Sequence, residues 1–396
     1  MGAQEVISCG DMGDLDLGDL TMLPAHVQKW IELVRHDADV RAALVGFEKL
    51  RPYQAQAVLA TVFRIRKTLE PLLITLPTGA GKSWVIAALA SVVQRIATVN
   101  SGKQKKVLVL AHSKELVQQN YQKIVEAGYR ATIYSSGLQQ RDASGDIVFG
   151  SRQTIINALD EFAGMDYEFA AVFVDEAHSM PSQTRDIIDG LRRINPNLRV
   201  IGLTATPYAM GKGYVFARDS YRNLPELREV YTRNPYFAER VFDKCVHELI
   251  AEGFLSPPIL GTISDHYNTE GLERTAGGSF TEASNNAVFV TGQGNLTKRI
   301  VAEVKEKSKD RNGVMFFAQN REHARQVLSF LPAEKAALVD SGTKSADRDR
   351  YIADFKEGKL KYLVTIAALA TGFDAPNVDF YKTLNFEAVC VFISNQ

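Results

Sequence analysis

The sequence is 396 residues long, 45% hydrophobic and 23% charged, which is the composition of a soluble protein with room for two or three domains. Lysine plus arginine and aspartate plus glutamate both number 46, so the net charge argues neither for nor against nucleic acid. Any such site must be a local patch. Cys9, Cys245 and Cys390 are far apart and form no C-x-x-C pair, so they support neither a disulfide framework nor a zinc site.

The N-terminal part of the chain indicates where in the cell the protein is located, and it contains a predicted additional helix. It lacks a signal sequence, and no uncharged run has the length of a membrane helix, so we expect a cytoplasmic protein without a membrane partner. Within residues 1–46, Val27, Trp30, Ile31 and Val34 repeat at helical spacing and predict one apolar stripe. The stripe either packs against the neighbouring domain or docks a partner.

A glycine-rich stretch, Leu76-Pro-Thr-Gly-Ala-Gly-Lys-Ser, lies between an apolar run and a helical pattern. Strand, glycine-rich turn, Lys-Ser and helix are the parts of a P-loop, in which backbone N–H groups and the helix N-terminus bind a polyphosphate. Lys82 would reach the β- and γ-phosphates of ATP, and Ser83 would bind Mg²⁺. Leu76 stands where the strict pattern has glycine, so a turn without a ligand is the alternative. The predicted nucleotide contacts in this loop are Thr78, Gly79, Ala80, Gly81, Lys82 and Ser83.

Residues 47–213 form the first predicted domain, in which apolar strands alternate with helical patterns. Strands separated by crossover helices imply a parallel sheet that binds ligands at the carboxyl ends of its strands. The predicted strands are Leu72–Leu76, Val107–Leu110, Ile147–Phe149, Ala171–Val174 and Val200–Leu203, and the predicted helices include Trp84–Ile96 and Lys114–Ala127. The fold class is therefore α/β.

Two adjacent acids, Asp175 and Glu176, follow the hydrophobic strand at Val172–Val174 and precede Ala177 and His178. Asp175 can hold Mg²⁺ while Glu176 polarises the attacking water, which makes both catalytic candidates beside Lys82. A helix N-cap, where acids are also favoured, is the alternative.

With these motifs the chain resembles a superfamily 2 helicase or translocase, the class whose motor consists of two RecA-like domains. Four further strings follow in the expected order: Arg51-Pro-Tyr-Gln54 (Q motif), Ala111–Leu116 (motif Ia), Gly150–Thr154 (motif Ib) and Gly202–Pro207 (motif III). The resemblance implies that Arg51 and Gln54 contact the nucleotide. It further implies a nucleic-acid channel at His112, Lys114, Ser151 and Arg152, and coupling of hydrolysis to strand contact through Thr204 and Thr206.

The resemblance extends over roughly Leu50 to Asp379 and is greatest to the RadD-type bacterial DNA-repair branch. Ile201-Gly-Leu-Thr-Ala-Thr-Pro207 and Gly253-Phe-Leu-Ser-Pro-Pro258 carry this likeness. Those proteins are DNA-stimulated ATPases with a cysteine-rich C-terminal extension, and these 396 residues contain nothing similar to that extension.

Residues 214–294 are expected to be a linker or insert. Arginines are interleaved with aromatic residues there, and they could grip a phosphate backbone or lie on a solvated helical face. Thr275–Gly294 is rich in Gly, Ser, Thr and Asn and predicts a loop. The arginines are Arg218, Arg222, Arg228, Arg233 and Arg240, and the aromatic residues are Tyr221, Tyr231, Tyr236 and Phe237.

Residues 295–396 are expected to form a second RecA-like domain that is incomplete. Its predicted strands are Val314–Phe317, Leu338–Val339 and Tyr362–Ile366, with a helix at Arg348–Phe355. Ala318-Gln-Asn320 resembles motif IV and Ala370–Pro376 resembles motif V. By that resemblance Gly372 and Asp374 face the nucleotide, and Thr343 and Thr365 face the nucleic acid.

The family pattern continues after Asp379 to motif VI, Q-x-x-G-R-x-x-R, whose arginines reach the γ-phosphate. Residues 380–396 contain no arginine and one lysine, Lys382. A disrupted reading frame, a shortened chain and a natural short form all fit this ending. We therefore expect weak hydrolysis from these 396 residues.

The sequence thus predicts an ATP- and Mg²⁺-dependent helicase-type ATPase that acts on single-stranded or branched DNA in DNA repair. Two other functions stay open: a non-hydrolysing module that binds ATP and DNA, and the motor subunit of a restriction system. A protein partner or second subunit also stays open.

Overall fold

The computed structural model describes residues 50–165, 168–209, 213–222, 234–261, 265–273, 280–292, 295–366, 378–384 and 390–393. They fall into two compact units, unit 1 (Met1–Leu249) and unit 2 (Ile250–Gln396). The predicted N-terminal helix within residues 1–46 lies outside the described residues, as do Gly372 and Asp374.

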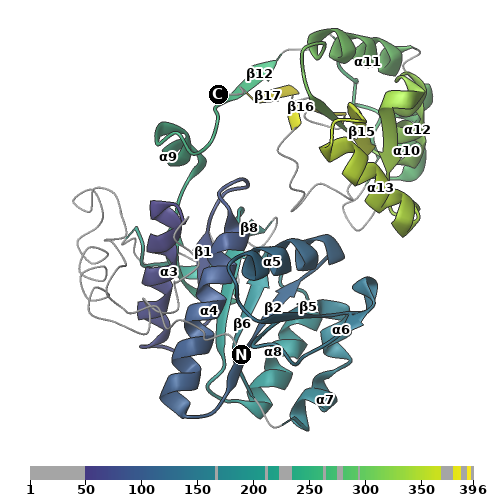
Figure 1. Ribbon diagram of the computed structural model, residues 1–396. Helices are drawn as coiled ribbons and strands as arrows, with labels where there is room; N and C mark the ends of the chain where they lie inside the picture. Colours follow the sequence, from purple (N-terminus) through teal and green to yellow (C-terminus); the bar gives the residue numbers. More distant parts are fainter. Residues whose placement is uncertain are drawn as a thin grey trace, which may run out of the picture. The chain divides into compact units, whose positions relative to one another are not determined.

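A nine-stranded sheet, in the order β10-β11-β1-β7-β6-β2-β5-β3-β4, forms the middle of unit 1 (Figure 1). Every neighbouring pair is parallel except β3–β4, which confirms the predicted α/β fold and parallel sheet. The five predicted strands are β1, β2, β5, β6 and β7. The bounds are β1 (Leu72–Thr75), β2 (Lys105–Ala111), β3 (Ala131–Ser135), β4 (Gln140–Arg141), β5 (Ile147–Ser151), β6 (Glu168–Asp175), β7 (Arg199–Thr204), β10 (Phe216–Asp219) and β11 (Phe237–Asp243).

Helices cover both faces of this sheet (Figure 1). One layer is α3 (Pro52–Ile65), α4 (Lys82–Ser101) and α5 (Lys114–Glu126), and the other is α6 (Arg152–Ile156), α7 (Leu159–Ala163) and α8 (Ser182–Ile194). Right-handed crossovers explain this division, because the chain moves along the sheet in one direction from β1 to β3 and returns from β5 to β7. The predicted helices at residues 84–96 and 114–127 are α4 and α5.

Helix α4 is the one helix in the described part of the chain that is long and apolar enough to cross a membrane. Its residues from Val85 to Val93 are buried, and it contacts α3, α5 and strands β2 and β6. That burial is the packing expected of a core helix.

Lys106 is a buried lysine at the start of β2, although the sequence predicted a purely apolar strand from Val107. Its Nζ donates to the carbonyl oxygens of Ala143, Ser144 and Gly145 at 2.7, 2.8 and 2.7 Å. Burial lowers the pKa of this ammonium group. Three carbonyl acceptors compensate its desolvation and fix the turn that leads into β5.

The predicted linker at residues 214–294 differs from the structure at its start, where β10 and β11 extend the first sheet. Buried Phe216 and Phe237 pack these strands into the core. Arg218 and Arg240 therefore lie on strands, so the expected helical arginine face is wrong for them. Arg218 pairs with Glu70, and Arg240 pairs with Asp219 and Asp243.

Unit 2 contains a six-stranded sheet in the order β12-β17-β16-β13-β15-β14. The strands predicted at residues 314–317, 338–339 and 362–366 are confirmed as β13, β14 and β15. The strand bounds are β12 (Pro258–Gly261), β13 (Gly313–Phe317), β14 (Ala336–Val339), β15 (Tyr362–Thr365), β16 (Val378–Thr383) and β17 (Cys390–Ile393). The helix bounds are α9 (Val246–Ala251), which spans the boundary of the units, α10 (Glu282–Asn286), α11 (Leu296–Lys307), α12 (Arg321–Ser329) and α13 (Ser345–Lys356).

The loop predicted over residues 275–294 is wrong where α10 and the following π-helical turn (Ala287–Thr291) form. Thr281 caps α10 by accepting a hydrogen bond from Ser284 N–H, and Val288 and Phe289 are buried. A cap followed by an apolar pair thus outweighs the polar composition of the segment.

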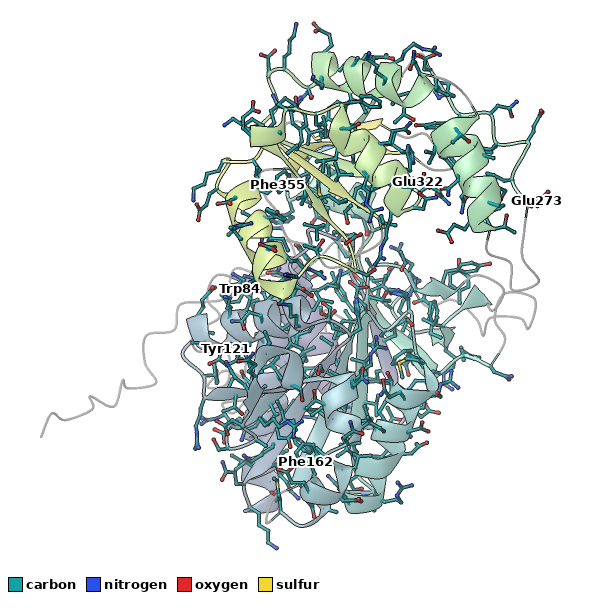
Figure 2. The ribbon with its side chains drawn as sticks, turned by 90° about the vertical axis from the view of Figure 1, so that its right-hand side faces the viewer. Trp84, Tyr121, Phe162, Glu273, Glu322 and Phe355 are labelled. Carbon is teal, nitrogen blue, oxygen red and sulfur yellow. The ribbon has the colours of Figure 1, made fainter. Side chains whose placement is uncertain are left out.

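Each unit has its own apolar core (Figure 2). Phe162 is 1% exposed and makes edge-to-face contacts with Tyr134 and Phe169 in unit 1. Phe355 is fully buried against Met315 and Val339 in unit 2. Burial of such large side chains is the main term that stabilises each unit.

Candidate nucleotide and nucleic-acid site

The strand order of unit 1 brings five predicted motifs to one edge of the sheet. In spatial order these are the P-loop after β1, Thr204 at the end of β7, Asp175 at the end of β6, His112 after β2 and Ser151 at the end of β5. Neighbouring strands lie about 4.8 Å apart, so the row spans about 20 Å. The predicted ATP residues therefore lie at one end of the row and the predicted nucleic-acid residues at the other.

The P-loop has the backbone shape that phosphate binding needs. Gly79 and Gly81 have φ angles of 81° and 74°, in the left-handed region that favours glycine. A Cβ on Gly81 would come within 2.4 Å of Gln54 Nε2. Leu76 is fully buried, and its N–H donates to Thr204 O at 3.0 Å. The residue that departs from the strict motif thus belongs to the core and leaves the loop intact.

The Q-motif residues support this loop. Gln54 Nε2 donates to Ala80 O at 2.8 Å, and Tyr53 Oη donates to the same oxygen at 2.9 Å. Gln54 Oε1 accepts from Arg51 N at 2.8 Å, while Arg51 Nη1 donates to Tyr53 Oη at 3.1 Å. Gln54 therefore ties α3 to the P-loop, and its contact with an adenine edge stays a prediction.

Lys82 and Ser83 open helix α4, and Lys82 faces Glu176, the residue after β6. Lys82 Nζ lies 3.9 Å from Glu176 Oε1, and Gln119 Nε2 donates to Ser83 Oγ at 3.0 Å. Thr78 and Gly79 are exposed, whereas Ala80 is fully buried. The loop thus exposes its backbone and the ammonium group of Lys82 to a ligand, while its apolar side packs into the core.

Asp175 is a buried carboxyl group, 6% exposed. Its Oδ2 accepts from Asn120 Nδ2 at 2.9 Å, and its Oδ1 accepts from the N–H of Glu176 at 2.9 Å. Burial, with the neighbouring charge of Glu176, raises the pKa of Asp175 above its ordinary value. A cation at this carboxylate would relieve the cost of that buried charge.

Glu176 is held as a carboxylate in an unusual backbone conformation. Its φ of 51° is left-handed, which costs a residue other than glycine roughly 1 kcal/mol or more and which clusters at functional sites. Burial opposes its charge, but the hydrogen bond from His178 and the charge of Lys82 hold the pKa of Glu176 below its ordinary value. An ionised carboxylate at neutral pH is the form that can accept a proton from water.

His178 and the two threonines predicted for coupling form a hydrogen-bonded group next to Glu176. His178 Nδ1 lies 3.3 Å from Glu176 Oε2 and 3.0 Å from Thr204 Oγ1. Thr204 Oγ1 also donates to Thr206 O at 3.2 Å and accepts from Thr206 N at 3.1 Å. Movement of the exposed Thr206 segment would therefore act on Glu176 through Thr204 and His178.

The predicted nucleic-acid residues of unit 1 lie next to one another. Desolvation, together with the charge of Arg152, lowers the pKa of His112, whose side chain keeps an exposed part. Arg152 Nη1 donates to Thr184 Oγ1 at 3.4 Å, and Ser151 Oγ lies 2.8 Å from Thr154 Oγ1. Lys114 is the first residue of α5, after the cap Ser113. Motifs Ia and Ib therefore form one basic corner.

In unit 2 the predicted nucleic-acid residues have other surroundings. Thr343 Oγ1 donates to Asp340 Oδ1 at 3.0 Å and closes a turn. Thr365 is fully buried at the end of β15, and among the described residues its hydroxyl has no hydrogen-bond partner. A direct strand contact by Thr365 is therefore not what this structure shows.

Ser83 and Asp175 are the protein donors that fit a Mg²⁺ ion. Within the described ranges, no group of three or more His, Cys, Asp and Glu side chains could hold a metal. Mg²⁺ at phosphate sites takes one or two protein oxygens and completes its shell with water and substrate phosphates, so two donors suffice.

Two residues of α5 that the sequence analysis missed contact these donors, Gln119 at Ser83 and Asn120 at Asp175. Asn120 interrupts the buried stripe formed with Leu116 and Ile124 at spacings of four residues. A polar residue in an apolar stripe is the signal that could have revealed it, because a buried amide needs partners. Asn120 Oδ1 is buried without a described partner.

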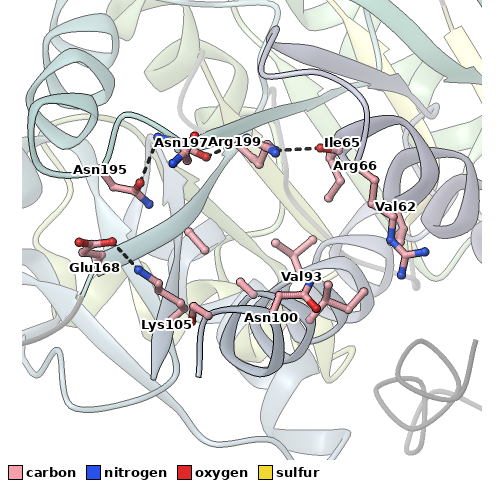
Figure 3. A pocket seen from close by; sticks show the side chains of 14 residues that line it. Val62, Ile65, Arg66, Val93, Asn100, Lys105, Glu168, Asn195, Asn197 and Arg199 are labelled. Carbon is pink, nitrogen blue, oxygen red and sulfur yellow. Dashed lines mark hydrogen bonds and ion pairs between the residues drawn. The ribbon is translucent and has the colours of Figure 1, made fainter. Parts of the chain in front are cut away.

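A cavity of about 440 Å³ lies at the opposite edge of the same sheet (Figure 3). Lys105, Glu168 and Arg199 line it, and these residues begin β2, β6 and β7. Lys105 pairs with Glu168, and Arg199 donates to Ile65 O at 2.8 Å. Because the P-loop follows the other end of the strands, this cavity is separate from the nucleotide site.

Two family models match the chain. Residues 47–209 match the type III restriction enzyme res subunit, and residues 295–387 match the helicase conserved C-terminal domain. The first match includes β1 to β8 and the second includes β13 to β16, and together they support a superfamily 2 helicase.

Two curated relatives carry the name of an ATP-dependent helicase. IRC3 of Saccharomyces cerevisiae is 24% identical over 337 residues, which cover 83% of this chain and 46% of the relative. The mitochondrial irc3 of Schizosaccharomyces pombe is 26% identical over 342 residues, covering 84% of this chain and 51% of the relative. The chain thus spans about half the length of these relatives.

Among solved structures, Saccharomyces cerevisiae Dbp5 bound to RNA and ADP BeF3 is similar in fold. Its TM-score is 0.55 at 15% identity, and the match covers 94% of this chain and 80% of Dbp5. The likeness supports two RecA-like helicase domains.

Replacing Asp175 by Asn should stabilise the fold at neutral pH. The raised pKa means that the folded state binds a proton more tightly than the unfolded state, so a penalty develops as the pH rises through the carboxyl pKa values. Asn removes that charge, and a flip of the Asn120 amide supplies an acceptor. We expect a gain of about 1 kcal/mol in unfolding free energy at pH 7 that shrinks in acid. Denaturant unfolding of the wild type and of Asp175→Asn across the pH range measures this gain. A loss of stability at pH 7 would contradict a raised pKa of Asp175.

Proposed function

We propose that this helicase-type chain is an ATPase that couples Mg²⁺-ATP to a single strand of nucleic acid. The observation that carries the proposal is the group formed by Lys82, Ser83, Asp175 and Glu176. Lys82 lies 3.9 Å from Glu176 at the carboxyl edge of a parallel sheet. Ser83 and Asp175 each accept a hydrogen bond from one of two adjacent residues of α5. That edge is where open α/β sheets bind their ligands.

Each of these residues has a role that its surroundings support. The P-loop amides and Lys82 would hold the phosphates, replacing the weak Lys82–Glu176 pair. Ser83 and Asp175 would hold Mg²⁺, which neutralises charge on the phosphates when bound. Glu176, ionised and oriented by His178, would accept a proton from the attacking water.

The nucleic-acid site of the proposal is the basic corner of His112, Lys114, Ser151 and Arg152. These residues follow β2 and β5, at the far end of the row that begins with the P-loop. Backbone contacts of this kind read charge and shape, so binding should be largely independent of sequence. We propose DNA as the target, a role in DNA repair of the RadD type, and a cytoplasmic location.

We propose further that residues 1–396, taken alone, hydrolyse ATP slowly. Phosphoryl transfer gains roughly 10³–10⁵ in rate from an arginine at the γ-phosphate, and the motif VI string is absent from these residues. Arg222 and Arg240 do not replace it in the structure, since they pair with Asp243 and Asp219. The hydrogen bond that Arg222 donates to Asp243 also raises the pKa of that guanidinium.

The motor of a restriction system is the second candidate. The match of residues 47–209 to the res subunit of type III restriction enzymes favours it. A nuclease would then have to be supplied outside these residues. Assays of DNA supercoiling or strand displacement, with and without an added nuclease partner, would separate the two functions.

Lys82→Ala should weaken Mg²⁺-dependent ATP binding by at least about tenfold, because a charge-assisted contact to phosphate is lost. Isothermal titration with a slowly hydrolysed ATP analogue measures this. Lys105→Ala, at the far edge of the sheet, is the matched control and should bind normally. Unchanged affinity in a folded Lys82→Ala protein would remove the basis of the P-loop assignment.

Steady-state hydrolysis by the 396-residue protein should be low, with and without single-stranded DNA, while nucleotide binding is retained. Glu176→Gln should abolish the residual rate but keep the binding, since the amide cannot accept the proton. Strong DNA-stimulated turnover would show that another arginine reaches the γ-phosphate, and it would overturn the slow-hydrolysis proposal.

A further inference from the structure

We propose that Tyr208 and Tyr214 form a platform on which bases of a single strand stack, next to the basic corner of unit 1. The inference rests on the proposed nucleic-acid binding and adds to it a class of contact, base stacking, and the residues that provide it. Two observations carry it: the exposure of the paired tyrosine rings, and a path of contacts from them to Arg152.

The two tyrosines face each other across a short antiparallel hairpin. They lie on β8 (Tyr208–Ala209) and β9 (Gly213–Tyr214), where Tyr208 is the direct partner of Tyr214. Tyr208 is 53% exposed and Tyr214 is 36% exposed. Their ring centroids are 5.7 Å apart at an interplanar angle of 85°. Large aromatic surface is costly to leave in water, so this pair is a candidate contact surface.

The hairpin is anchored to the core at its base. The ring of Tyr214 lies 5.4 Å from that of Phe216, which is 2% exposed. Val215 N donates to Pro207 O at 3.0 Å, which closes the hairpin onto the chain. An anchored ring loses little conformational freedom when a base stacks on it, which favours binding.

The position of the hairpin follows from the topology. It begins four residues after Thr204, the last residue of β7, so it rises from the carboxyl edge that carries the other motifs (Figure 1). Thr204 and Thr206 form the hydrogen-bonded turn that connects the two. A base held by the hairpin would therefore lie close to the His178–Glu176 group.

Helix α8 connects the hairpin to the basic corner. Arg152 donates to Thr184 in the first turn of α8, and the next residue, Arg185, lies 5.5 Å above the ring of Tyr236. Phe237, which follows Tyr236, donates its N–H to the carbonyl oxygen of Val215 beside Tyr214. A chain of contacts through α8 and the start of β11 thus links Arg152 and Arg185 to the tyrosine hairpin.

A single strand fits this arrangement better than a protein segment or a duplex. Arginines spaced along the path can follow phosphates, while exposed rings accept any base, which is how sequence-tolerant single-strand sites are built. In a duplex the bases are stacked on each other, so none is free to stack on the tyrosine rings. Arg218 and Arg240, two of the five arginines that the sequence suggested for this role, are engaged by carboxylates instead.

The test compares binding of an oligothymidylate and an abasic strand of equal length, which differ in bases and not in charge. Tyr208→Ala should weaken binding of the oligothymidylate at least about fivefold and leave the abasic strand unchanged. Tyr208→Phe, which keeps the ring, should behave as the wild type. Tyr129→Ala is the matched control, since Tyr129 precedes β3 at the opposite edge of the sheet.

Arg152→Ala separates this proposal from the proposed function, because it should weaken both strands by the same factor. Suppose that Arg152→Ala weakens binding of both strands. If Tyr208→Ala then weakens neither strand, or weakens both by the same factor, the stacking platform is wrong and the nucleic-acid site stands. If none of the variants changes binding, the proposed nucleic-acid function itself is wrong.

Discussion

Two adjacent carboxylates at the buried end of β6 are the constraint on which the rest of unit 1 depends. Neither Asp175 nor Glu176 could remain charged there without donors and positive charge from neighbouring elements. The start of α4 supplies Lys82, α5 supplies Asn120, and the turn after β6 supplies His178, which β7 orients through Thr204. The order β1-β7-β6-β2 is what makes these contributions meet, because each comes from an element beside the acids.

Helix α5 connects these acids to the proposed nucleic-acid site. Its first residue, Lys114, belongs to the basic corner, while Gln119 and Asn120, between one and two turns further along, contact Ser83 and Asp175. If α5 moves as a rigid body, a ligand that shifts one end would displace the groups at the other. The His178–Thr204–Thr206 contacts offer a second route to the tyrosine hairpin.

Sequence reasoning reached the fold and the motif positions because both depend on local signals. Apolar runs bounded by polar clusters predicted five strands of unit 1, and Gly79 and Gly81 predicted a turn that only glycine makes easily. It could not reach contacts between distant residues. Gln54 bracing Ala80, the buried Lys106, and the pairing of Arg240 with Asp219 depend on which elements become neighbours, and no pattern in one segment reports that. The edge strand β10 and its neighbour β11 were missed because their residues resemble a linker in composition.

The central claim is that nucleotide and single strand bind to sites that are energetically linked. The most direct measurement is the affinity of the 396-residue protein for a fluorescent single strand, with and without a saturating Mg²⁺-ATP analogue. Linked sites predict a change of at least about fivefold, with the strand changing nucleotide affinity by the same factor. Lys82→Ala should abolish the effect of the nucleotide analogue on strand affinity. It should not alter strand affinity in the absence of nucleotide. Equal affinity in the two states, with both ligands shown to bind, would contradict the account.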